Sequence, residues 1–231
     1  MTYSSTIARA ELLPRATPVK IARFTVDGSL VDFPLTEADL TRDAAWSTAL
    51  LSELGLLAGH HILISSFSWH GVWFDGLRKG AVELGAAYSN VEAWGWDVTR
   101  FTSFLNRFEF EMVIGVGSES VAALAQGGQA AELLGRARRI LARPDAVAPL
   151  AELGIDASVI GMAGPVLLVS DPSSEGLVFN DDEWLIESDD GELIVTTSGP
   201  RAARFDRQRT GVRGSVVQVA GRTVVRMEDV R

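Results

Sequence analysis

The sequence lacks cysteine and contains three histidines among its 231 residues. Without cysteine, the chain has no disulfide bond, no thiolate metal site and no cysteine nucleophile. The histidines, His60, His61 and His70, do not show a spacing typical of metal ligands. The sequence therefore predicts neither a metal site nor a disulfide-stabilised fold.

Basic residues and long apolar runs are also scarce. The 21 lysines and arginines are outnumbered by 30 acidic residues, giving a formal net charge of −9, which argues against nucleic acid or an anionic membrane as a partner. The chain has no run of about 18 apolar residues, as a membrane span requires, and positions 1–15 lack the apolar core of a signal peptide. We therefore expect a cytoplasmic protein.

Helix and strand patterns alternate along the first two thirds of the chain. With 47% hydrophobic residues, the sequence can bury a sizeable core. Apolar spacing and turn residues predict helices at 36–55, 72–85, 97–108, 118–126 and 144–154. They predict strands at 61–66, 86–91, 110–116, 139–142 and 155–161. This alternation is typical of a parallel sheet with crossover helices.

Short strands replace the helices after residue 163. They are expected at 166–169, 176–180, 184–186, 192–197 and in a hairpin at 215–227 that turns at Ala220 and Gly221. We predict an α/β domain at 1–163 and a β-rich lobe at 164–231.

The segment 191–214, GELIVTTSGPRAARFDRQRTGVRG, pairs an amphipathic strand with an arginine-rich turn. It resembles the GELVxT and RYRTGD or RYRTRD strands of the phenylacetate-CoA ligase branch of the adenylate-forming ligases. Further segments resemble that family in the same order: LTEADL, LGLLAGHHILIS, SFSWHGVWFDGLRKGAVELGA, GMAGP and GLVFNDDEWLIES. The resemblance covers about 31–214. It implies the α/β, parallel-sheet large domain of an adenylate-forming ligase with a β-rich C-terminal lobe.

Three positions depart from what the resemblance implies for nucleotide binding. Val212 stands where the family has an acidic residue that holds the ATP ribose. Met162 and Ala163 stand where a Thr-Glu pair is expected, so the carboxylate that would bind Mg²⁺ is missing. The expected phosphate loop reads FTVDGSLVDFP and brings Asp27 and Asp32 near the place of the phosphates. We therefore predict no cofactor, with ATP and Mg²⁺ disfavoured.

Aromatic residues and one histidine gather on two loops that follow neighbouring strands, where open α/β sheets bind ligands. His70 is the candidate catalytic acid or base. The candidate substrate-binding residues are Ser65, Ser66, Phe67, Trp69, Trp73, Trp94, Trp96 and Gly164. A CoA ester is a candidate substrate. Alternatively, His70 is a hydrogen-bonded structural residue and the tryptophans are packing residues.

Two groups of arginines allow two interpretations each. Arg207 and Arg209 bind an anion such as a CoA phosphate, or they pair with the acidic surface. The cluster RARRILAR at 136–143 is expected to be a solvated edge between helix and strand rather than a nucleic-acid site.

Three hypotheses of function follow. The favoured one is a non-adenylating relative of acyl- or aryl-CoA ligases that binds a small aromatic or acyl ligand. The second is a non-catalytic binding or scaffold subunit, and the third is a ligase completed by a partner chain. Residues 215–231 are too few for the family's C-terminal domain, which we expect to be absent; a homodimer or a partner enzyme would cover the face that it leaves.

Overall fold

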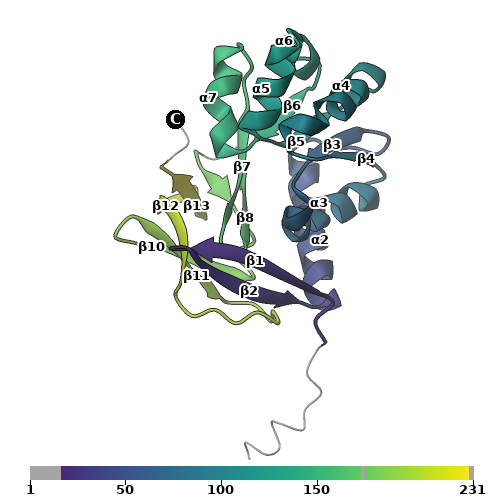
Figure 1. Cartoon of the computed structure of the whole chain (residues 1–231). Helices are drawn as coiled ribbons and strands as arrows, with labels where there is room; N and C mark the ends of the chain where they lie inside the picture. The colour runs from purple at the N-terminus through teal and green to yellow at the C-terminus, as the bar shows by residue number, and fades with distance from the viewer. Residues whose placement is uncertain (1–16, 173–174, 229–231) are drawn as a thin grey trace, which may run out of the picture.

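The computed structural model describes residues 17–172 and 175–228 (Figure 1). Its first elements are strands β1 (Lys20–Val26) and β2 (Ser29–Leu35), which pair antiparallel and form a separate hairpin. The hairpin turns at Asp27 and Gly28, whose φ angles of 48° and 76° are those of a tight two-residue turn. The segment that the sequence analysis interpreted as a degenerate phosphate loop is thus two strands joined by a short turn.

Eleven further strands of the described residues form one mixed sheet in the order β10-β11-β12-β13-β9-β8-β7-β6-β5-β3-β4. Pairing is parallel among β3, β4, β5, β6 and β7, and antiparallel from β7 through β8 to β10. The strands are β3 (His61–Ser65), β4 (Ala87–Val91), β5 (Met112–Val116), β6 (Arg139–Ala142), β7 (Ser158–Ala163), β8 (Val166–Ser170), β9 (Leu177–Val178), β10 (Trp184–Asp189), β11 (Glu192–Thr197), β12 (Gln208–Val219) and β13 (Arg222–Met227).

Helices cover both faces of the parallel part of the sheet (Figure 1). Helices α2 and α3 lie on one face, and α4 to α7 lie on the other. Their bounds are α2 (Glu37–Glu53), α3 (Gly71–Glu83), α4 (Val98–Arg107), α5 (Ser118–Gln126), α6 (Ala130–Leu134) and α7 (Pro144–Glu152). None of the helices within 17–172 and 175–228 is long and apolar enough to cross a membrane.

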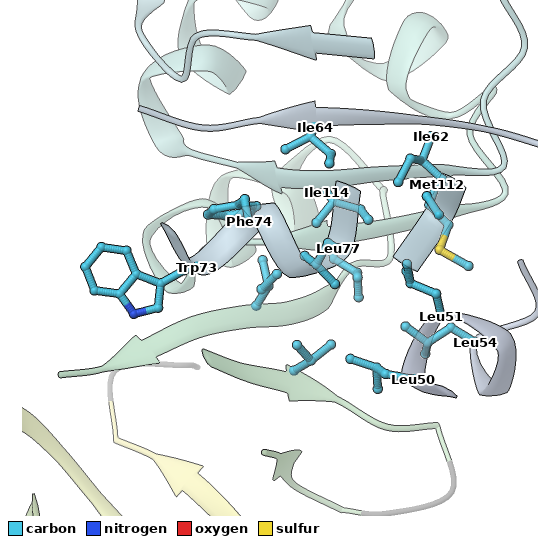
Figure 2. Close-up of a cluster of buried hydrophobic side chains, with 14 of the residues drawn as sticks. Leu50, Leu51, Leu54, Ile62, Ile64, Trp73, Phe74, Leu77, Met112 and Ile114 are labelled. Carbon is cyan, nitrogen blue, oxygen red and sulfur yellow. The ribbon is translucent and has the colours of Figure 1, made fainter. Parts of the chain in front are cut away.

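The strands divide their side chains between two cores because successive residues point to opposite faces. In β3, Ile62 and Ile64 pack against α2 and α3, whereas Leu63 packs against the helices of the other face. Figure 2 shows Ile64 above Phe74 of α3 in the first of these cores. A third core lies under the antiparallel strands. All three are apolar layers on one continuous sheet.

The expected helices and strands are confirmed, with differences at their ends. Thr36 and Asp39 form the predicted capping box at the start of α2. Asp97 does not cap α4 with its side chain; its carboxylate instead accepts a hydrogen bond from the backbone N–H of Glu92 and pairs with Arg100. The predicted boundary after residue 163 falls at the turn where parallel pairing gives way to antiparallel pairing, and the sheet continues across it.

Candidate functional site

The two serines at the end of the buried strand β3 face the interior. Ser65 is fully buried, and its Oγ atom has no hydrogen-bond partner among the described residues. Ser66 is 5% exposed, and its Oγ atom accepts a hydrogen bond from Arg78 Nη2 at 3.1 Å. Both side chains therefore support the loop after β3 and do not line the large groove described below.

The aromatic residues predicted to meet at the carboxyl edge of the sheet do meet. The Phe67 and Trp69 rings stack with centroids 4.8 Å apart, and Trp94 from the neighbouring loop lies 4.6 Å from Phe67. These rings fill the space between the two loops by packing against one another. Trp96 is 71% exposed and makes no ring contact with the described residues.

His70 lies between this aromatic cluster and Trp73. The centroids of the His70 and Trp73 rings are 5.6 Å apart. Burial of the imidazole and, to a lesser extent, the positive charge of Arg143 lower the pKa of His70 to about 4. The ring is therefore neutral at pH 7 and a weak base. A general acid or base works best when its pKa is near the working pH, so this environment does not suit the acid-base role expected from the sequence.

A groove of about 880 Å³, which we call the hairpin groove, runs between β1 and the segment Ser68–Trp73. Phe24, Gly164 and Val212 are among its lining residues, and its volume is within the range of small-molecule sites. Of the predicted residues, those that line it are Trp69, His70, Trp73 and Gly164. Ser65, Ser66, Phe67, Trp94 and Trp96 do not line it.

Trp73 connects the groove to the core. Its ring packs on Phe33 of β2 with centroids 5.6 Å apart, and Figure 2 shows the indole extending sideways from α3. Its Nε1 atom is buried without a hydrogen-bond partner among the described residues. Phe24, on β1, packs on the same Phe33 at 6.0 Å. The hairpin is therefore attached to the sheet domain by aromatic contacts, and its position defines the groove.

The hairpin contributes a wall of the groove that the sequence did not predict. Lys20 pairs with Asp75 of α3 across the groove, and Arg23 Nη2 donates to Asp32 Oδ2 at 3.0 Å within the hairpin. Asp32 is thus neutralised rather than repulsive as the sequence analysis assumed, and its hydrogen bond with Arg23 lowers the pKa of the Asp32 carboxyl. An Asp-Gly pair between alternating segments is a strong hairpin signal, and it was available at positions 27–28.

The candidate anion-binding arginines lie outside the groove. Arg207 pairs with Glu187 at 2.7 Å, and Arg209 pairs with Glu192, where its hydrogen bond lowers the pKa of that carboxyl. This arrangement agrees with the second interpretation, in which both arginines pair with the acidic surface. The pair of Arg207 with Glu187 is exposed and contributes little to stability, whereas Glu192 is largely buried beside Arg209.

Arg143 departs from the solvated edge expected for the cluster 136–143. It is 9% exposed, and its guanidinium carbon lies 4.4 Å from the centroid of the Phe67 ring. The Nε and Nη2 atoms have no hydrogen-bond partner among the described residues. Arg136 is exposed and pairs with Glu132, as a solvated edge requires. The cluster therefore divides into an exposed part and one buried side chain that closes the carboxyl edge of the sheet.

Comparison with known proteins reveals similarity in structure. No protein-family model and no curated protein matches the sequence. A 2-hydroxyisobutyryl-CoA ligase, solved with 2-HIB-AMP and CoA, is similar over 96% of this chain and 56% of the ligase, with a TM-score of 0.70 and 15% identity. The o-succinylbenzoate CoA synthetase from Bacillus subtilis, solved with a product analogue, gives a TM-score of 0.60 and 16% identity over 91% of this chain and 52% of its own.

These likenesses concern the arrangement of helices and strands. The chain spans about half the length of the solved ligases that it matches. No cluster of three or more potential metal ligands occurs within residues 17–172 and 175–228. The chain has the mixed α/β fold of the adenylate-forming CoA ligases.

Proposed function

We propose that this protein is a non-adenylating relative of acyl- and aryl-CoA ligases, which binds a small aromatic or acyl ligand in the hairpin groove. The ligand is a free acid or its thioester with CoA or a carrier. The observation that carries this proposal is the groove itself, which is large, open to solvent and walled by Trp69, His70 and Trp73. These aromatic rings offer an apolar surface to such a ligand, beside a wall of paired charges at Lys20, Asp75, Arg23 and Asp32.

Three features in and beside the groove support the absence of ATP chemistry. The hairpin has a two-residue turn at Asp27 and Gly28 where the family resemblance implies a longer loop of backbone N–H groups around phosphate. Val212 and Met162 line the groove with apolar side chains at two positions where that resemblance implies polar nucleotide contacts. Ala163, beside Met162, is fully buried and has no oxygen to offer a cation.

His70 has a definite role in this proposal. Because its pKa is about 4, the imidazole enters the groove wall as an uncharged ring at neutral pH. A neutral ring beside Trp69 and Trp73 is compatible with an apolar ligand, whereas an imidazolium would favour an anion. The uncharged His70 ring therefore favours contact with the acyl or aryl part of the ligand.

The test combines a binding assay with an assay for adenylation. Benzoate, phenylacetate, hexanoate and their CoA thioesters are titrated into the protein by calorimetry. Val212→Trp places a large side chain at a residue that lines the groove, and Val82→Trp places the same side chain on an exposed position of α3 outside it. We expect Val212→Trp to abolish binding and Val82→Trp to leave it unchanged.

ATP-pyrophosphate exchange is measured with the same acids. We expect no exchange above background. Robust exchange by the isolated protein would contradict the non-adenylating function, and equal ligand binding by the two tryptophan variants would contradict the site.

A further inference from the structure

Each strand of the hairpin uses one of its two edges to hydrogen-bond the other strand. Val26 faces Ser29 beside the two-residue turn, so these residues form the first hydrogen-bonded pair of the ladder. Hydrogen-bonded and non-hydrogen-bonded pairs alternate along an antiparallel ladder. The backbone N–H and C=O groups of Ile21, Arg23 and Thr25 therefore point away from β2, to the other edge of β1.

Pro34 supports this register. It faces Ile21, at a position where the ladder needs no N–H group from β2. The same proline places a ring where the outer edge of β2 would otherwise present a donor, and this is a common way of blocking an edge strand. The outer edge of β1 has no proline within Lys20–Val26.

The open edge of β1 faces the hairpin groove. Six consecutive residues, 20–25, line the groove, whereas β2 contributes only Leu30 and Asp32. If one face of β1 lined the groove, only every second residue would contribute to it. Because successive residues contribute, the edge of the strand is turned towards the groove. Among the described residues, β1 pairs only with β2.

Two contacts flank this edge. Lys20 pairs with Asp75 of α3 at the beginning of β1. Near the end of β1, a Cβ atom on Gly211 would lie 3.4 Å from the carbonyl oxygen of Thr25, so β12 comes close without joining the ladder. The part of the edge around Ile21 and Arg23 faces the groove wall formed by Ser68–Trp73, so an added strand has to lie between β1 and that segment, where a single extended segment fits more readily than the sheet edge of a second copy.

We propose that the hairpin groove accepts an extended polypeptide segment of a partner, which adds to β1 as a third strand of the hairpin. This inference goes beyond the proposed function, because the segment and the small ligand would occupy the same groove and each is expected to displace the other. The outward groups of Ile21 and Arg23 lie about 6.8 Å apart, which is the two-residue period of an extended polypeptide. Strand addition of this kind is a general mode of peptide recognition.

The charges on the groove restrict the partner segment further. Lys20 is paired with Asp75 and Arg23 with Asp32, so the walls offer no unpaired charge of either sign. Ile21 is 71% exposed and Trp69 is 56% exposed, and both lie along the open edge. The segment that fits is uncharged and carries an apolar or aromatic side chain on the face towards Trp69.

The test uses a fluorescein-labelled peptide, Gly-Ser-Val-Thr-Phe-Ser-Gly with blocked ends, and fluorescence polarisation. Ile21→Pro removes one outward N–H group, and Ile21→Ala, the matched control, keeps that group while removing the same exposed side chain. Both substitutions leave the pairing between β1 and β2 intact, which melting temperatures of the two variants verify. We expect Ile21→Pro to weaken peptide binding at least about tenfold relative to Ile21→Ala.

A second comparison changes the peptide instead of the protein. Two peptides are N-methylated at alternate residues, one at the odd and one at the even positions, so that each has one blocked edge. We expect one of these peptides to lose binding and the other to keep it. Equal binding of both methylated peptides, equal binding by Ile21→Pro and Ile21→Ala, or no binding to the unaltered protein at millimolar peptide would overturn strand addition. Phenylacetate binding that Val212→Trp abolishes would still support the proposed function, so the two failures are distinguishable.

Discussion

The guanidinium carbon of Arg143, at the end of β6, lies 4.4 Å from the centroid of the Phe67 ring, which follows β3. This contact holds a buried positive charge beside the aromatic cluster and near His70, whose pKa it lowers. We expect Arg143→Met to raise the pKa of His70 part of the way from about 4 towards 6.5, because burial is the larger cause and remains. NMR titration of the imidazole measures it. Arg138→Met, at an exposed pair with Glu111, is the control, and an unshifted His70 would contradict the assignment.

The depressed pKa of His70 makes stability depend on pH. The folded-state pKa of about 4 is below the ordinary value of 6.5, so the unfolded chain binds more protons between these values. Stability is fully present above pH 6.5 and is lost as the pH falls towards 4. We expect a loss of about 1 to 2 kcal/mol, reduced from full linkage by partial solvent exposure of the ring. Urea unfolding at pH 7 and pH 4.5 measures it, and His70→Gln should remove this part of the difference.

The parallel part of the fold could be predicted because its signals are local. Capping residues such as Thr36 and Asp39, the apolar run of β5 and the spacing of α3 each fix an element within a short stretch of sequence. The turn at Ala220 and Gly221 was predictable for the same reason, since glycine readily takes the positive φ angle that Gly221 adopts there.

The candidate site was only partly predictable because it is assembled from distant segments. The meeting of Phe67 with Trp94 followed from the order of parallel strands. The hairpin wall did not, since it depends on the packing of Phe33 against Trp73, forty residues further along the chain. The pKa of His70 depends on burial and on Arg143, and neither is visible in the sequence around the histidine.

A buried ion network joins α2 to the segment after β11. Arg201, with 4% of its side chain exposed, binds both carboxylate oxygens of Asp43 at 2.7 and 2.9 Å and also pairs with Glu183. We expect Arg201→Met to reduce the free energy of unfolding by about 3 kcal/mol, because it removes the bidentate partner of Asp43 and leaves the buried Glu183 with Arg42 alone. Arg207→Met removes an exposed pair and should cost less than about 1 kcal/mol. Chemical unfolding compares them, and equal losses would contradict this account.

Helices α2 and α3 approach closely because α3 has glycine at the contact. A Cβ atom on Gly80 would lie 2.8 Å from the backbone nitrogen of Thr48, and neither backbone can move without separating the helices. We therefore expect Gly80→Ala to lower stability by about 2 kcal/mol, despite the better helix propensity of alanine. Gly71→Ala, in the first turn of the same helix with nothing within 4 Å of the new atom, should leave stability unchanged or raise it by up to about 1 kcal/mol. Thermal unfolding of both variants measures the difference. Since propensity favours alanine at both positions, a loss confined to Gly80→Ala would isolate the cost of forcing the two helices apart.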